Sequence, residues 1–334
     1  MRFVSAIVIV ILSMFAPVAV MSPAAAAQTS TVLVGGGIPG TAVVSNSFSP
    51  RTIEVAVGDT VQWQFQQPWI LHTVTFVGSE KAPELLVPEG DKLYFNPQVF
   101  FPAGDKTYDG TGYRNSGAPP EAEKLTSKFS YSLTFTKAGT YEYVCMVHPG
   151  MTGTVMVKDK ATGSPASRLA QGRREMAAIL KAGQAAFAKW KPERKGNEVI
   201  LAMVGDPKEG WSNFRYSSQP LVIKRGTTVT WAQRDPFELH TITFTAGAKV
   251  PDFVVVEAQK QGPPKLLLNP KAGTPSQTKT YDGMGWVNSG ILFPPGAPGN
   301  PPSNFSLTFT KAGRYEYFCI IHAPWGMKGT VVVQ

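Results

Sequence analysis

An internal repeat constrains the fold of this chain more than any other feature. Three segments occur twice: LHTVTF (71–76) and LHTITF (239–244), YDGTGYRNSG (108–117) and YDGMGWVNSG (281–290), LTFTKAGTYEYVC (133–145) and LTFTKAGRYEYFC (307–319). The spacing between the copies drifts only from 168 to 174 residues. Because a repeat unit of this length can enclose its own hydrophobic core, the sequence predicts two tandem domains of one fold.

Each copy carries the pattern of β-strands. In RTIEVAVGDTVQWQF (51–65), apolar residues occupy every second position before and after a Gly-Asp turn, and LVIKRGTTVTW (221–231) repeats this alternation. A period of two is typical of half-buried strands joined by a tight turn. With six to eight such strands per copy, the sequence predicts an all-β chain of two β-sandwiches.

The N-terminus has the pattern of an export signal. Arg2 precedes an apolar run from Phe3 to Met21, and AAAAQ (24–28) offers a cleavage site near Ala27. We therefore expect a signal peptide over residues 1–27, domains over 28–158 and 197–334, a linker over 159–196, and a periplasmic or extracellular location. The apolar run is long for a signal peptide, so an uncleaved membrane anchor remains the alternative.

The linker is predicted to contain a helix. Ser164 can cap it, Pro165 suits its first turn, and Met176, Leu180 and Phe187 form an apolar stripe at helical spacing. Gly172 and Gly183 count against the helix, since glycine disfavours helix interiors.

Most of the excess positive charge lies in this segment. Residues 158–195 carry 10 basic and 3 acidic side chains, against 8 and 11 in residues 28–157 and 13 and 9 in residues 196–334. Such a distribution argues against a nucleic-acid-binding face on either domain. Two interpretations stay open: a linker helix whose charges face water, or a docking surface for an acidic partner protein or an anionic membrane.

The segments CMVHPGM (145–151) and CIIHAPWGM (319–327) place a thiol, an imidazole and a thioether close together. The chain has only two cysteines and four histidines, and the remaining histidines, His72 and His240, lie in the repeated LHT segments. Two imidazoles, one thiolate and a weak thioether are the ligand set of a trigonal copper site with a long axial bond. The candidate metal ligands are His72, Cys145, His148 and Met151, and, in the second copy, His240, Cys319, His322 and Met327.

With these residues, each copy resembles a cupredoxin, the blue-copper fold with a Greek-key β-sandwich. The resemblance covers residues 30–158 and 197–334 and includes GDTVQW, the His-Thr pair and the Gly-x-Tyr-x-Tyr-x-Cys approach. Cys-x-x-His-x-x-Met in the first copy is similar to the amicyanin loop, and Cys-x-x-His-x4-Met in the second to the plastocyanin and halocyanin loop. The family's copper ligands fall on the eight candidate residues, which implies two type 1 coppers per chain and an electron-transfer function.

Two further features follow from the resemblance. His148 and His322 are expected to present a ring edge at the surface, as electron ports, through apolar patches that include Val147 and Trp325. Where many family members have an asparagine after the first histidine, this chain has Thr73 and Thr241, whose hydroxyls are expected to tie the ligand loops together.

The same residues allow other interpretations. A Cys145–Cys319 disulfide would require two equivalent interior positions to meet, which is geometrically awkward. Copper nitrite reductases and multicopper oxidases add a second kind of copper centre held by further histidines, and two type 1 sites already use all four. We therefore expect no enzyme and no small-molecule substrate. Copper storage or delivery remains the alternative function, although the ten methionines form no tract.

The long segment between the first histidine and the cysteine holds the repeated YDGxG motif. A glycine-rich turn closed by an aromatic side chain is the favoured interpretation, and a partner-specific lid near the metal is the other.

Overall fold

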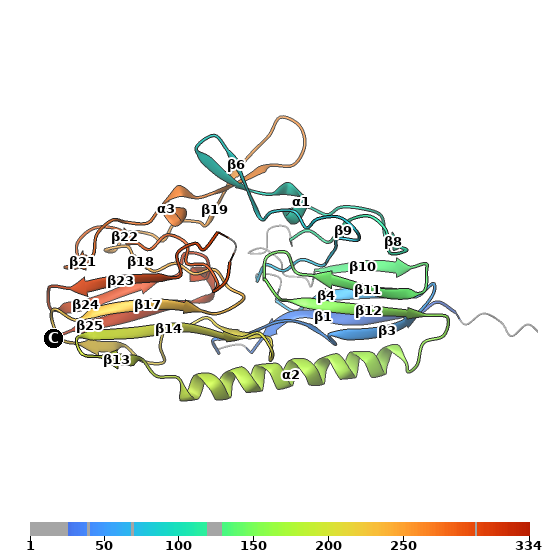
Figure 1. Cartoon of the computed structure of the whole chain (residues 1–334), viewed down its shortest axis with the longest axis horizontal. Coiled ribbons are helices and arrows are strands. Elements are labelled where there is room, and N and C mark those ends of the chain that lie inside the picture. The colour runs from blue at the N-terminus through green and yellow to red at the C-terminus, as the bar shows by residue number, and fades with distance from the viewer. Residues whose placement is uncertain (1–25, 39–40, 68–69, 119–128, 298) are drawn as a thin grey trace, which may run out of the picture.

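The computed structural model describes residues 26–38, 41–67, 70–118, 129–297 and 299–334. These residues form two β-sandwiches side by side, with one long helix running beneath both (Figure 1). The predicted signal segment lies almost entirely outside the described ranges. Among the helices within those ranges, none combines the length and the apolar character needed to cross a bilayer.

The N-terminal half, residues 29–158, consists of two facing sheets with the strand orders β2-β1-β4-β10-β8 and β3-β12-β11-β5-β9. The two-residue strands β8 and β9 each form one edge of a sheet, and a short helix, α1, lies between β7 and β8. The elements are β1 (Thr29–Gly37), β2 (Val43–Ser49), β3 (Thr52–Ala56), β4 (Thr60–Phe65), β5 (Thr75–Phe76), β6 (Leu86–Glu89), β7 (Lys92–Phe95), α1 (Pro97–Phe100), β8 (Thr107–Tyr108), β9 (Arg114–Asn115), β10 (Ser130–Phe135), β11 (Gly139–Val144) and β12 (Thr152–Lys158).

The C-terminal half repeats this topology, with the orders β15-β14-β17-β23-β21 and β16-β25-β24-β18-β22. The all-β fold with two sandwiches, predicted from the repeat, is therefore confirmed. The elements are β13 (Glu193–Lys195), β14 (Glu198–Asp206), β15 (Trp211–Asn213), β16 (Leu221–Ile223), β17 (Thr228–Arg234), β18 (Thr243–Phe244), β19 (Val254–Glu257), β20 (Lys265–Leu268), α3 (Pro270–Gly273), β21 (Thr280–Tyr281), β22 (Val287–Asn288), β23 (Asn304–Phe309), β24 (Gly313–Phe318), the 3-10 turn η2 (Ala323–Trp325) and β25 (Lys328–Val333).

Each sandwich has an aromatic core of the same design. Trp63 on β4 is fully buried and meets Tyr143 on β11 edge-on, with ring centroids 5.2 Å apart. Trp231 and Tyr317 repeat the contact at 5.1 Å. The alternation read from the sequence therefore has its physical origin in the pleat, which turns every second side chain of these strands into the sandwich.

The two halves share one continuous sheet. Edge strand β2 of the N-terminal half pairs antiparallel with β15 of the C-terminal half, with Ser45 opposite Trp211. The pairing joins the two inner sheets into a sheet of eleven strands and satisfies backbone groups that an edge strand would otherwise expose.

A second, smaller sheet bridges the halves on the side opposite the helix. The hairpin β6-β7 and the hairpin β19-β20 come from the long connections of the two halves and meet where Tyr94 pairs with Leu267 (Figure 1). Lys92 and Tyr94 on β7 both contact the carboxylate of Glu257 on β19, at 3.1 and 3.0 Å. The extra length noted in the sequence therefore builds an interface between the halves.

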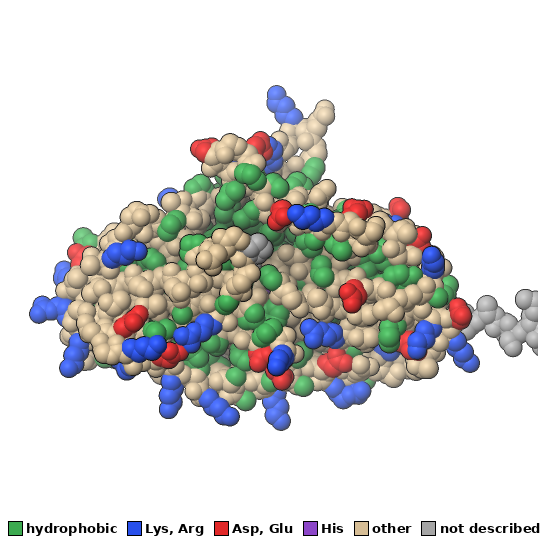
Figure 2. Space-filling view, viewed as in Figure 1, with side chains coloured by type: hydrophobic (Ala, Val, Ile, Leu, Met, Phe, Trp, Pro, Cys, Tyr) green, Lys and Arg blue, Asp and Glu red, His purple; other side chains and the backbone are tan. Residues whose placement is uncertain are grey.

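The predicted linker helix is α2 (Pro165–Lys189), which packs along β1, β2 and β15. Ser164 caps the start of the helix: its hydroxyl accepts a hydrogen bond from the backbone N–H of Ser167. The Ser167 hydroxyl in turn accepts a hydrogen bond from the backbone N–H of Ser164. The apolar stripe faces the sheet, with Leu180 buried. Lysine and arginine side chains project along the lower edge of the molecule, where α2 runs (Figure 2).

Gly172 and Gly183, which disfavour a helix by propensity, allow α2 to pack closely against β2. A Cβ on Gly172 would lie 2.4 Å from the carbonyl oxygen of Ser49, and one on Gly183 would lie 2.5 Å from Val43 Cγ1. Both glycines are buried, so the missing side chains let the helix approach β2. Tertiary packing here outweighs the low helix propensity of glycine.

Candidate metal centres

Three of the predicted ligands converge in the N-terminal half. Cys145 follows β11, His148 lies in the turn before β12, and His72 lies in the connection after β4. The Cys145 Sγ is 3.5 Å from Nδ1 of His148 and 3.9 Å from Nδ1 of His72, and the two Nδ1 atoms are 3.0 Å apart. All three side chains are buried, so one thiol and two ring nitrogens face a common point away from solvent.

The C-terminal half repeats this group. The Cys319 Sγ lies 3.4 Å from Nδ1 of His322 and 3.8 Å from Nδ1 of His240. In each group the three ligand atoms lie within 4.8 Å of one another. The two groups contain all four histidines of the chain, and both cysteines are free thiols rather than partners in a disulfide.

The methionines predicted as axial ligands close the ligand loops. The backbone N–H of Cys145 donates to the carbonyl of Met151 at 2.9 Å, and Cys319 donates to Met327 at 3.1 Å. Both methionine side chains are buried in the same core cluster as the cysteine of their own half. The longer second loop accommodates its two extra residues in η2, which ends at Gly326 in the left-handed conformation.

Threonine ties the ligand loops together, as expected from the resemblance. The Thr73 hydroxyl accepts a hydrogen bond from the backbone N–H of Met146 at 2.8 Å, and the Thr73 N–H points at Cys145 Sγ at 3.4 Å. Thr241 makes the same two contacts, with Ile320 and Cys319. The hydroxyl therefore connects the first-histidine loop to the cysteine loop in both halves.

The repeated YDGxG segment is connected by hydrogen bonds to the threonines that join the ligand loops. Tyr108 is buried in the core, in agreement with the favoured interpretation of an aromatic side chain closing a turn. At the end of the motif, Asn115 Oδ1 accepts a hydrogen bond from the Thr75 hydroxyl, which contacts the Thr73 hydroxyl. The motif therefore anchors the ligand loops.

The surroundings of the two thiols and of His72 favour the metal-binding forms of these three ligands. Burial alone raises the pKa of the Cys145 and Cys319 thiols, but the neighbouring histidines outweigh burial and lower the pKa of both thiols well below the usual range. Burial also lowers the pKa of His72. A thiolate and a neutral imidazole are the forms that bind metals.

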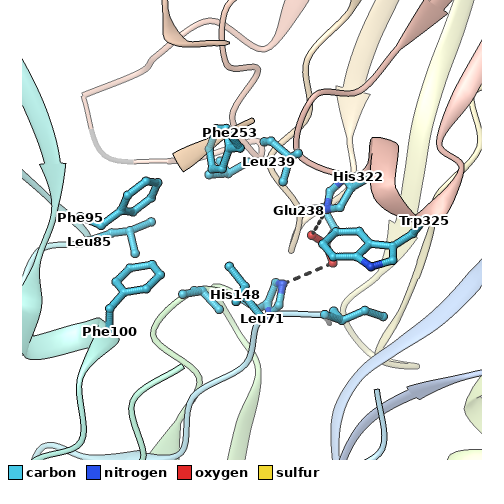
Figure 3. A pocket seen from close by; sticks show the side chains of 13 residues that line it. Leu71, Leu85, Phe95, Phe100, His148, Glu238, Leu239, Phe253, His322 and Trp325 are labelled. Carbon is cyan, nitrogen blue, oxygen red and sulfur yellow. Dashed lines mark ion pairs between the residues drawn. The ribbon is translucent and has the colours of Figure 1, made fainter. Parts of the chain in front are cut away.

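The ring edges of His148 and His322 do not form surface ports, and that expectation is wrong. His148 and His322 are only 5% and 3% exposed, and their Nε2 atoms face the interface between the halves. The apolar residues expected around the ports line a small cavity there, of about 60 Å³ (Figure 3). The ports are covered because each half docks against the other through these patches.

Sequence reasoning missed Glu238, the charged residue at this interface. Its Oε1 lies 3.4 Å from Nε2 of His148, and its Oε2 lies 3.3 Å from Nε2 of His322. Burial opposes ionisation of this carboxyl, but the two histidines outweigh burial and hold the pKa of Glu238 well below its usual range. In turn, burial lowers the pKa of each ring, while Glu238 and the thiols raise it, to about 10 for His148 and about 9 for His322.

The sequence contained one signal that could have identified Glu238. In the aligned repeats, the residue two positions before the first ligand histidine is Ile70 in one copy and Glu238 in the other. The two copies are alike around their first ligand histidine, yet one carries an apolar side chain at this position and the other a carboxylate. Such a difference so close to a metal ligand is unusual. Its role could not be recognised without the packing of the halves.

Parts of the chain resemble known copper proteins. Residues 41–158 and 297–334 match the family of copper-binding proteins described as plastocyanin/azurin. An amicyanin of Paracoccus versutus is 26% identical over 115 residues, which are 31% of this chain and 87% of the relative. An amicyanin of Paracoccus denitrificans is 29% identical over 123 residues, 37% of this chain and 61% of the relative, so the match spans less than two thirds of that protein.

Among solved structures, the chain is similar to the Cu(I) form of an amicyanin mutant. The two are 23% identical, with a TM-score of 0.24, over 43% of this chain and 92% of the other.

Proposed function

The chain is a cupredoxin of the plastocyanin/azurin copper-binding family with two tandem domains, and we propose that it is an exported electron-transfer protein. Each half would hold one type 1 copper, through His72, Cys145, His148 and Met151 in the first half. The observation that carries the proposal is the duplicated, buried group of one thiol and two Nδ1 atoms. Copper bound in such a group supplies a one-electron couple between Cu(II) and Cu(I).

The residues fit this metal. In the second half the corresponding ligands would be His240, Cys319, His322 and Met327. A soft thiolate, two imidazoles and a thioether suit both oxidation states of copper. Because the hydrogen-bonded loops and the core hold these side chains, little rearrangement would accompany electron transfer. The two ligand loops differ in length, so we expect the two sites to have different reduction potentials.

The alternatives have less support. In both groups the cysteine and histidine side chains are at most 5% exposed, which disfavours a storage or delivery protein that must exchange metal readily. A nitrite reductase or multicopper oxidase would need further histidine ligands, and the two groups use all four. We therefore propose an electron carrier rather than an enzyme.

The experiment that tests the function is a copper titration of the protein without residues 1–27. We expect two coppers per chain, an intense blue absorption band and an EPR spectrum with narrow hyperfine splitting, because a copper–thiolate bond of this kind gives both signatures. Binding of one copper or none, or a colourless complex, would contradict the proposal.

The redox partner is proposed to be an acidic protein that docks on the basic outer face of α2. Arg173, Arg174 and Lys181 are all exposed on this face, and a basic surface attracts acidic partners at low ionic strength. An anionic membrane surface is the alternative occupant. We expect no sedimentation of the protein with phosphatidylserine vesicles at 0.15 M salt. Sedimentation that the triple Arg173→Gln, Arg174→Gln, Lys181→Gln variant abolishes would favour the membrane instead.

A further inference from the structure

Glu238 is a single buried carboxylate shared by the two candidate copper sites. It is 3% exposed and lies in the connection after β17, two residues before the ligand His240. Its two oxygens contact the Nε2 atoms of His148 and His322, one oxygen each, from opposite halves of the molecule (Figure 3). Among the described residues, these two imidazoles are its ion-pair partners.

The hydrogen bonds around Glu238 fix its orientation. Asn46, on β2 of the N-terminal half, donates from Nδ2 to Glu238 Oε1 at 2.7 Å and to Ser212 Oγ at 2.9 Å. Gln233 donates to the Glu238 carbonyl. Since Asn46 belongs to one half and Ser212 to the other, the pairing of β2 with β15 places the carboxylate between the two ligand groups.

The repeat makes this arrangement asymmetric. The equivalent residue in the N-terminal half is Ile70, which is buried and packs with the core of the C-terminal half. Two carboxylates at these matched positions would repel each other in a buried interface, whereas one carboxylate can face both imidazoles. A single bridge therefore requires the two copies to differ at this position, as they do.

The ligand atoms determine what the bridge can do. The Nδ1 atoms of His148 and His322 face the ligand groups of their own halves, so a metal held there leaves Nε2 as the protonated nitrogen. Both Nε2–H groups then point at the same carboxylate. Outer partners of this kind orient ligand histidines and tune the metal.

We propose that His148, Glu238 and His322 form an internal path for electrons between the two metal sites. The inference rests on the proposed function, because it requires copper in both halves. With copper in both halves, these three residues would connect the sites for the transfer of one electron, so that one copper would be oxidised from Cu(I) to Cu(II) while the other is reduced from Cu(II) to Cu(I). No bond forms or breaks, and both Nε2 protons stay on their rings.

The surroundings suit such a path. Apolar side chains from both halves line the cavity beside the bridge, among them Leu71, Val147, Leu239 and Ile321. Because they limit access of water, the charges at the bridge are screened less than at the surface. The histidine edges are covered, so an external partner cannot contact them directly. The two sites instead face each other across Glu238.

The test measures electron exchange between the two sites after a reducing pulse that delivers less than one electron per chain. The spectra of the single-copper variants Cys145→Ser and Cys319→Ser identify each site. Glu238→Leu removes both contacts, while Glu238→Gln keeps an oxygen for one ring only. We expect the exchange to slow by roughly tenfold or more in Glu238→Leu, the scale of losses when an outer partner of a ligand histidine is removed.

Glu257→Gln is the matched control. Glu257 is another carboxylate of the C-terminal half that contacts the N-terminal half, through Lys92 and Tyr94 on β7. The change from glutamate to glutamine is the same as in Glu238→Gln. The Glu257→Gln variant should exchange electrons at the wild-type rate. Equal slowing in Glu257→Gln and Glu238→Gln would mean that domain docking, rather than the bridge, sets the rate, and would overturn the proposal.

A second readout needs no electron transfer. In the protein with zinc in both sites, NMR should find the Nε2 protons of His148 and His322 protected from exchange with water, and Glu238→Leu should remove that protection. If two blue coppers bind but Glu238→Leu changes neither the exchange rate nor the protection, the internal path is wrong and the proposed function stands. If wild-type protein binds no copper, the proposed function itself fails.

Discussion

Replacing Cys145 with serine is expected to remove one of the two blue copper centres and to leave the other intact. A serine hydroxyl has nearly the same size as the thiol but stays protonated and is a hard ligand, so it cannot replace the thiolate for copper. The loss in copper affinity should exceed the roughly 10- to 100-fold that replacement of an outer partner costs. Copper content and the visible and EPR spectra measure the result.

Cys319→Ser should remove the other centre, and the double variant should remove both. The sites are expected to respond separately because each cysteine packs within the core of its own half. The two single variants also give the separate reduction potentials. As a control, Met284→Ser replaces sulfur by a hydroxyl at a side chain that is 71% exposed, and it should keep both coppers. Loss of both spectra in one single-cysteine variant would contradict two independent centres.

Asn115→Asp is expected to cause the largest loss of stability in the N-terminal half outside its aromatic core. The Asn115 Nδ2 donates toward three carbonyl oxygens around α1, those of Gln98, Val99 and Phe101, at 2.9 to 3.1 Å. Its Oδ1 accepts from Thr75 at 2.8 Å, and the side chain is fully buried. Aspartate keeps the shape but turns an oxygen toward the three carbonyls.

The expected cost follows from the groups left without partners. Each unsatisfied buried polar group costs about 1 to 3 kcal/mol, so the free energy of unfolding should fall by about 3 kcal/mol or more. Denaturant titration measures it. Because Thr75 contacts Thr73, copper affinity of the N-terminal site should fall as well. Asn304→Asp, the same change at an exposed asparagine, should stay within about 0.5 kcal/mol. A similarly small effect of Asn115→Asp would show that this network does not hold the loop.

The parallel residue in the C-terminal half makes the same contacts. Asn288 Nδ2 donates to the carbonyls of Lys271, Ala272 and Thr274, and its Oδ1 accepts from Thr243. The duplicated network explains why the NSG end of the motif is retained in both copies. The sequence showed the repetition of this motif but not its partners, because the carbonyls lie 14 to 17 residues away in the chain.

Local sequence pattern determined much of this protein. Alternating apolar residues predicted the strands, and Ser164 with Pro165 predicted the start of α2. The spacing of Cys145, His148 and Met151 predicted a compact ligand group, because a strand end and a short turn can bring such neighbours together. These features depend on residues close in the chain or on the repeat itself, so they can be read without knowing how the halves meet.

Only the tertiary structure decided what the ligand histidines face on their outer side. The hydrogen bond between Asn46 and Glu238 joins residues 192 positions apart, and the hairpins of the two halves meet through Tyr94 and Leu267. No local pattern specifies such pairings. They follow from how two folded surfaces fit, and the same docking buries the edges of His148 and His322 and places one carboxylate between them.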